Sequence, residues 1–186
     1  MRIISGTARG TKLFTLEGLE TRPTLDRVKE PLFSIIQNKI QDSNVLDLFA
    51  GSGALGIEAL SRGANLCVFC DCSNRAINII KQNLEKTRCK DKAIVIPTDY
   101  ISYLEKVRKD KFVFDIIFLN PPYDSDLIYL AVKKIKEINI LNQDGIIIAE
   151  TDNDKSIVDK LKKIDINIID IRKYGRVKLL FLNWKG

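Results

Sequence analysis

Short apolar runs alternate with longer amphipathic segments along most of the chain. The runs suited to buried strands cover residues 44–49, 66–71, 93–97, 114–119 and 145–150. Segments with helical periodicity follow them, over residues 54–62, 75–85, 100–108, 127–138 and 156–164. This alternation predicts a doubly wound α/β fold, with a mostly parallel central sheet and helices on both faces.

The two ends of the chain depart from this pattern. Residues 166–174 and 176–184 are apolar runs separated by Gly175 alone, which leaves no room for a crossover helix, so they predict an antiparallel hairpin at the sheet edge. Residues 1–43 precede the first sheet strand and predict a small β-hairpin over residues 2–16, turning near Gly6 to Gly10, followed by a helix.

The helix of this extension is expected to begin near Thr24 or Asp26, either of which would cap it. Pro31 would remove a hydrogen bond from the helix interior, which predicts a late start or a kink at Glu30. The chain is therefore expected to be one domain, residues 1–186, in which residues 1–43 extend a core formed by residues 44–186.

Composition adds a bias toward anionic partners. The 186 residues are 45% hydrophobic, which is sufficient for one core, and they carry a net charge of +6. No stretch approaches the roughly 18 apolar residues that span a bilayer, so we expect a cytoplasmic protein without membrane contact.

The cysteines do not predict a metal site. Cys67, Cys70 and Cys72 form a C-x-x-C-x-C string, but Cys67 and Cys70 would point to opposite faces of a strand, and the chain has no His. We interpret these cysteines as small buried hydrophobes and expect no metal.

A glycine-rich turn is the first candidate for chemistry. In "VLDLFAGSGALGIEAL", Gly51, Gly53 and Gly56 satisfy G-x-G-x-x-G between a strand and a helix, and Asp71 ends the next strand 20 residues after Gly51. Alone, this pattern predicts a dinucleotide enzyme. The spacing is weak evidence, however, because any ligand that approaches such a turn closely requires residues without side chains.

Charge favours a different ligand. Asp47 lies just before the glycines, where a carboxylate would repel a pyrophosphate and attract a cation such as S-adenosylmethionine. Asp71 would then bind the ribose hydroxyls, and Asp99 and Tyr100 would reach the adenine. The alternatives are that Asp47 accepts hydrogen bonds from loop N–H groups and that Asp99 caps a helix.

The fourth strand ends in "NPPY", residues 120–123. The side-chain oxygen of Asn120 and the carbonyl of Pro121 would accept hydrogen bonds from a planar amine, and Tyr123 would stack on the attached ring. Pro122 stiffens the exit of the strand. The alternative is that the two prolines merely turn the chain.

These segments resemble a known family. "VLDLFAGSGALGIEALSRGA" with "NPPY" resembles Rossmann-like S-adenosylmethionine-dependent amino-methyltransferases. "MRIISGTARG", "RPTLDRVKEPLF" and "YGRVKLLFLNW" are similar to the RsmD-type 16S rRNA guanine-N2 methyltransferases of bacteria. The resemblance implies methyl transfer from S-adenosylmethionine, with S-adenosylhomocysteine as product, to a guanine N2 of 16S rRNA or the small ribosomal subunit, by an enzyme that we expect to be a monomer.

The resemblance also implies roles for individual residues. The implied cofactor-binding residues are Asp47, Phe49, Gly51, Gly53, Asp71, Asp99, Tyr100 and Asn120. The implied catalytic residues are Asn120, Pro121, Pro122 and Tyr123, and the implied RNA-binding residues are Arg2, Arg9, Lys12, Arg22 and Arg27. The family more often has Asp at the position of Asn120 and a small non-proline residue at that of Pro31.

Other functions remain open at this point. Adenine-N6 and protein-glutamine methyltransferases share the "NPPY" element, so these are the nearest alternatives. A nicotinamide oxidoreductase and an RNA-binding module without catalytic activity are the alternatives from other classes.

Overall fold

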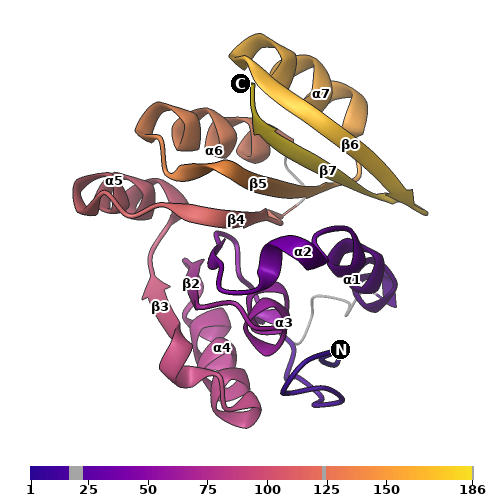
Figure 1. Ribbon diagram of the computed structural model, residues 1–186, viewed down its shortest axis with the longest axis vertical. Helices are drawn as coiled ribbons and strands as arrows, with labels where there is room; N and C mark the ends of the chain where they lie inside the picture. Colours follow the sequence, from indigo (N-terminus) through magenta and orange to yellow (C-terminus); the bar gives the residue numbers. More distant parts are fainter. Residues whose placement is uncertain (17–22, 123–124, 186) are drawn as a thin grey trace.

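One seven-stranded sheet organises the computed structural model, which describes residues 1–16, 23–122 and 125–185 (Figure 1). The strands are β1 Asn44–Asp47, β2 Leu66–Asp71, β3 Ala93–Pro97, β4 Phe114–Leu119, β5 Leu141–Thr151, β6 Ile166–Tyr174 and β7 Val177–Trp184. Their order in the sheet is β3-β2-β1-β4-β5-β7-β6. Strands β1 to β5 run parallel, and β7 is antiparallel to both β5 and β6. The predicted fold class, with its C-terminal hairpin, is confirmed.

Helices cover both faces of the sheet. They are α1 Pro23–Ile35, α2 Gln37–Ile40, α3 Ala54–Ser61, α4 Asn74–Thr87, α5 Tyr100–Asp110, α6 Ser125–Ile138 and α7 Asp154–Leu161, with 3-10 turns η1 Lys90–Lys92 and η2 Lys162–Ile164. Successive strand residues point to opposite faces, so Val45 packs in a core with α1 to α4 and Leu46 in a core with α5 to α7. Within the described ranges, no helix is long and apolar enough to cross a membrane.

Four strand ends differ from the sequence-based expectation, and one of them is the end of β5, at Thr151 rather than Glu150. β1 ends at Asp47, two residues early, because the chain turns there. β5 begins at Leu141 rather than at Gly145, with a register shift against β4 that accommodates the extra residues. The β6–β7 turn contains Arg176 as well as Gly175, and only Gly175 has a positive φ, of 65°. A positive φ at the first of two turn residues is what a type II′ hairpin requires.

Helix α1 begins earlier than expected. It starts at Pro23, so Thr24 and Asp26 lie inside the helix and neither caps it, and the expected late start is wrong. Pro23 suits the first helical position because its missing N–H would have no partner there in any case. Pro31 lies within the helix, which continues to Ile35.

The N-terminal arm, residues 1–16, lies along α3 (Figure 1). Its hairpin closes through a single antiparallel bridge between Arg2 and Lys12 rather than through full strands. Near the end of α3, the Thr7 N–H donates to the Ser61 carbonyl at 2.8 Å. The buried side chains Ile3 and Leu13 join the core that contains α1 to α4.

A buried carboxylate on α3, that of Glu58, binds both the N-terminal arm and α1. Glu58 is fully buried and accepts hydrogen bonds from the N–H groups of Ile4, at 2.9 Å, and Ser5, at 3.0 Å. It also pairs with Lys29 of α1 at 3.1 Å and with Arg62 at 2.8 Å. Four donors from three segments therefore converge on one side chain.

Replacing Glu58 by Gln should destabilise the protein by about 3–5 kcal/mol, because the buried Lys29 ammonium loses the negative charge that lies 3.1 Å from it. Urea unfolding monitored by circular dichroism measures the change. The matched control is Glu85→Gln, since Glu85 pairs with Lys90 at 3.3 Å but is 66% exposed. The control should change the free energy of unfolding by less than about 1 kcal/mol. Equal effects of the two substitutions would contradict this account of the Glu58 cluster.

Candidate active site

The strand order places the two sequence motifs side by side. The sheet order reverses between β1 and β4, which pair in parallel with Asp47 opposite Phe118. The Leu48 N–H also donates to the Phe118 carbonyl at 3.1 Å, so the two chains remain adjacent as they leave the sheet. The glycine loop after β1 and the Asn120 tip after β4 therefore lie next to each other at the carboxyl ends of the strands. Ligands of such sheets bind there.

Each glycine of the loop meets a separate constraint. Gly51 and Gly53 have φ of 55° and 77°, in the left-handed region, and Gly53 precedes α3 as its N-cap residue. A Cβ at Gly56 would lie 2.3 Å from the Phe69 ring and 2.6 Å from the Cys67 sulfur, so only glycine lets α3 approach β2 this closely. A Cβ at Gly51 would meet no atom within 4 Å, so this position faces open space.

Asp47 is buried beneath this loop. It is 2% exposed, and its Oδ2 accepts a hydrogen bond from the Gly56 N–H at 3.1 Å. The alternative interpretation, in which this carboxylate binds nearby N–H groups, is therefore realised in part. Burial raises the pKa of Asp47 to about 7, the Gly56 N–H opposes the shift, and the Asp71 carboxylate adds to it. Ionised Asp47 is thus unfavourable unless a positive charge lies nearby.

Asp71 holds the loop from the end of β2. Its Oδ2 accepts from the Gly51 N–H and its Oδ1 from the Ser73 N–H, both at 2.8 Å. The side chain is half-buried, so it is oriented at the loop and still reaches the surface of the site. A fixed acceptor at this position is what a ribose hydroxyl requires.

Asp99 caps α5, as the alternative interpretation held. Its Oδ1 accepts from the N–H groups of Ile101 and Ser102, and its Oδ2 from the Ser102 hydroxyl. These hydrogen bonds lower the pKa of Asp99, and the one from the Ser102 hydroxyl has the largest effect. The next residue, Tyr100, packs against Phe49 with ring centroids 5.3 Å apart. The structure therefore brings the segments after β1 and β3 together through an aromatic pair.

The tip after β4 is anchored in the core. Leu119 is fully buried, Asn120 is half-buried, Pro121 is buried and Pro122 is exposed. The polar side chain of Asn120 therefore lies where the buried strand reaches the surface. Tyr123 lies outside the described residues, so its stacking role stays a prediction.

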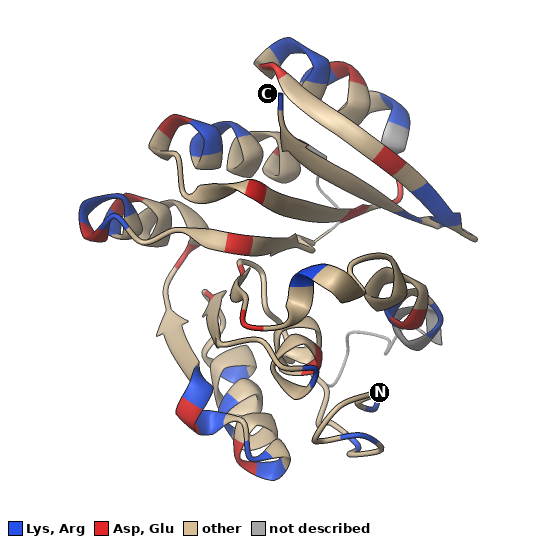
Figure 2. Ribbon diagram, viewed as in Figure 1, with Lys and Arg blue, Asp and Glu red and all other residues tan. Residues whose placement is uncertain are grey.

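Four of the five predicted RNA-contact residues are described, and all four are exposed. Arg2, Arg9 and Lys12 are exposed on the N-terminal arm, and Arg27 is exposed on α1. Arg22 lies outside the described residues. Figure 2 shows further Lys and Arg on the outer surfaces of α4 and α7.

The cysteines are mostly buried, as expected. Cys67, Cys70 and Cys89 are buried, but Cys72 is exposed, because it follows the last residue of β2. The expectation of a buried side chain is wrong for Cys72. Among the described residues, no group of three or more His, Cys, Asp or Glu is placed to hold a metal ion.

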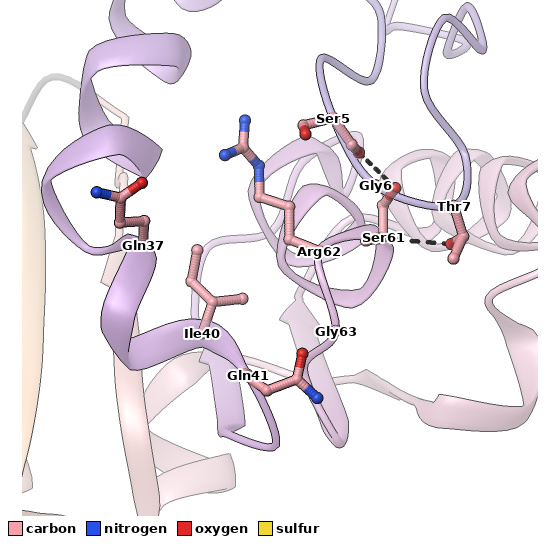
Figure 3. A pocket seen from close by; sticks show the side chains of 9 residues that line it. All are labelled: Ser5, Gly6, Thr7, Gln37, Ile40, Gln41, Ser61, Arg62 and Gly63. Carbon is pink, nitrogen blue, oxygen red and sulfur yellow. Dashed lines mark hydrogen bonds between the residues drawn. The ribbon is translucent and has the colours of Figure 1, made fainter.

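A hollow of about 590 Å³ lies between the N-terminal arm, α2 and the end of α3 (Figure 3). It is lined by Ser5, Gly6, Thr7, Gln37, Ile40, Gln41, Ser61, Arg62 and Gly63. Gln41 and Gly63 precede β1 and β2, so this hollow lies toward the amino-end edge of the sheet. It is therefore separate from the glycine loop and the Asn120 tip, which lie at the carboxyl ends of the strands.

Asn83 is a site residue that the sequence interpretation missed. It is fully buried on α4, and its Nδ2 donates to the Ser52 carbonyl at 2.9 Å and to the Phe14 carbonyl at 3.0 Å. Its Oδ1 accepts from the Phe14 N–H at 2.7 Å. Its signal in the sequence is a polar residue on the buried face of α4, between Ile80 and Leu84.

Comparison with known proteins identifies the family. The family model described as Conserved hypothetical protein 95 matches residues 1–183. A Haemophilus influenzae protein named Ribosomal RNA small subunit methyltransferase D is 37% identical over 180 residues, which cover 94% of this chain and 93% of that protein. The chain belongs to the RsmD family.

Two further comparisons agree with this assignment. YlbH of Bacillus subtilis is 42% identical over 154 residues, 83% of this chain and 84% of that protein. The solved structure of yhhF from Escherichia coli is 29% identical with a TM-score of 0.83, covering 100% of this chain and 99% of that one. The chain is an S-adenosylmethionine-dependent methyltransferase with the RsmD-family fold.

Asp47→Asn should change how the stability of the cofactor-free protein depends on pH. Because the folded-state pKa is raised from 3.8 to about 7, wild-type stability falls as pH rises through that range. The variant lacks this titration, so at about pH 8 it should be more stable than the wild type by roughly 2–4 kcal/mol. Urea unfolding at about pH 5 and about pH 8 measures the difference. Parallel pH profiles of the two proteins would refute the assignment to Asp47.

Proposed function

We propose that this enzyme transfers a methyl group from S-adenosylmethionine to the exocyclic N2 of a guanine in 16S rRNA of the small ribosomal subunit. The observation that carries the proposal is the β1–β4 pairing, which brings the glycine loop, with its buried Asp47, and the Asn120 tip together at the carboxyl ends of the strands. The names of relatives such as the Haemophilus influenzae protein support rRNA as substrate. The choice of guanine N2 rests on the resemblance of residues 1–33, because "NPPY" is shared with adenine-N6 and protein-glutamine methyltransferases.

The loop fits the proposed cofactor. The open space beside Gly51 admits a ligand against the backbone, and Asp71 presents fixed oxygens for hydroxyl groups. Asp47 gains most from a cationic ligand, because its charge is otherwise disfavoured by burial. Bound S-adenosylmethionine supplies an electrophilic methyl group on a sulfonium. The other proposed contacts are Phe49, Gly53, Asp99, Tyr100 and Asn120.

The tip supplies acceptors for the amine. An exocyclic amino group is a weak nucleophile, because its lone pair is shared with the ring. Hydrogen bonds accepted by the Asn120 side-chain oxygen and the Pro121 carbonyl would favour a pyramidal nitrogen that directs its lone pair toward the methyl. Pro122 restrains the backbone here, and Tyr123 would stack on the base.

The N-terminal arm and α1 would hold the RNA. Arg2, Arg9, Lys12 and Arg27 are exposed, and together with Arg22 they would bind phosphates and position the target base, turned out of its stack, in the crevice. Because bacterial ribosomal subunits are made in the cytoplasm, the proposal places the enzyme there. We further propose that it acts as a monomer.

Transfer of labelled methyl groups to small subunits, protein-free rRNA and DNA tests the substrate. N2-methylguanosine in ribosomal RNA is the expected product, because the proposed acceptors and basic arm together suit an exocyclic amine in RNA. Nucleoside analysis of the digested RNA identifies the methylated base. Label found in adenine N6 or in protein glutamine would replace the proposed substrate by one of those alternatives. Label in no substrate would contradict the proposal.

Asn120→Ala should reduce kcat by at least about 100-fold, because one of the two acceptors is lost. The affinity for S-adenosylhomocysteine, measured by calorimetry, should change by less than about threefold, because Asn120 is only one of several proposed cofactor contacts and the glycine loop and Asp71 are untouched. Asn120→Asp is the control, because it retains an acceptor oxygen, and it should keep much more activity than the Ala variant. A large loss of cofactor affinity in Asn120→Ala would remove Asn120 from the catalytic role.

A further inference from the structure

Phe14 is an exposed aromatic side chain at the edge of the proposed crevice. It is 47% exposed, whereas its neighbour Leu13 is 7% exposed and belongs to the core. Lys12 is also exposed, so the arm alternates outward and inward side chains here, and Lys12 and Phe14 share the outward face. A large apolar ring in this position is not needed to fill the core.

The backbone of Phe14 is fixed relative to the glycine loop. Both its N–H and its carbonyl bond to the Asn83 side chain, at 2.7 and 3.0 Å. The same Asn83 nitrogen bonds the carbonyl of Ser52, between Gly51 and Gly53, at 2.9 Å. One buried amide therefore holds Phe14 next to the loop that faces the proposed cofactor.

A cation lies on the ring. Lys86 is one helical turn beyond Asn83 on α4, and its ammonium is 4.4 Å from the centroid of the Phe14 ring. Lys86 and Lys12 are both exposed, so the surroundings of the ring carry positive charge. An aromatic surface beside exposed cations is the combination that binds single-stranded nucleic acid, by base stacking and phosphate contact.

We propose that Phe14 is a stacking platform for a nucleobase of the RNA strand that flanks the target base, with Lys86 contacting a neighbouring phosphate. The inference rests on the proposed function, since it presumes an RNA substrate. It adds an aromatic contact to the phosphate contacts that the basic residues of the arm would make with the RNA. The ring would then help to fix the position of the strand, because stacking orients a base in a way that phosphate contacts do not.

Phe14→Leu tests the platform, because it keeps apolar bulk against Lys86 and removes the aromatic face. Loss of one base–aromatic stack corresponds to roughly 5- to 150-fold in affinity. We therefore expect kcat/KM for RNA to fall by about 10-fold or more, mainly through KM. Affinity for S-adenosylhomocysteine and the melting temperature should stay within experimental error of the wild type. Phe14→Trp should have a kcat/KM equal to or above that of the wild type. A purely structural role for Phe14 would not produce this result.

Ile94→Ala provides the matched control, because Ile94 is 44% exposed and lies near the start of β3, toward the opposite edge of the sheet. It should leave kcat/KM unchanged. Equal kcat/KM for Phe14→Leu and wild type would overturn the inference. If the wild type methylates no RNA, the proposed function fails, and binding of a fluorescent single-stranded RNA to both proteins then decides the inference separately. Equal RNA affinities would overturn it, and a loss of about 10-fold in the variant would support it.

Discussion

The parallel pairing of β1 with β4 is the constraint on which the site depends. Backbone hydrogen bonds fix Asp47 opposite Phe118, and the Leu48–Phe118 bond carries the register past the end of β1. A slip of one residue would turn Ile117 and Phe118 to the wrong faces, and both are fully buried in different cores. The packing of the sheet therefore enforces the alignment of the glycine loop with the Asn120 tip.

A second constraint ties the N-terminal arm to that site through buried polar groups. Glu58 and Asn83 bond backbone groups of the arm near its start and its end, while Asn83 also bonds the glycine loop. Detaching the arm would leave these buried groups without partners, which is costly in a low-dielectric interior. Buried hydrogen bonds therefore join the arm, α3 and the glycine loop, so a displacement of the arm would disturb the loop as well.

Features that depend on neighbouring residues in the chain could be predicted from the sequence, whereas features that depend on distant residues could not. The bounds of β2 and β4 matched the expectation, because continuous apolar runs mark strands buried on both faces. The bounds of β3 also matched, although this edge strand is partly exposed. β5 was misjudged at its start, because a register shift admits polar residues that read as a turn. Glu58 and Asn83 were missed because their partners on the arm are backbone groups more than 50 residues away, which no periodicity records.

Asp47 illustrates how burial changes an argument made from charge alone. A permanently ionised carboxylate would simply repel a pyrophosphate, but burial keeps Asp47 largely neutral until the pH approaches 7. A neutral Asp47 repels an anion only weakly, so repulsion of a pyrophosphate is not the main reason for a preference for cationic ligands. A cation, in contrast, stabilises the ionised form that burial disfavours, and its binding is coupled to release of a proton. If Asp47 contacts the cofactor as proposed, preference for a positively charged cofactor arises on binding, through the same burial that disfavours ionisation of Asp47 in the free protein.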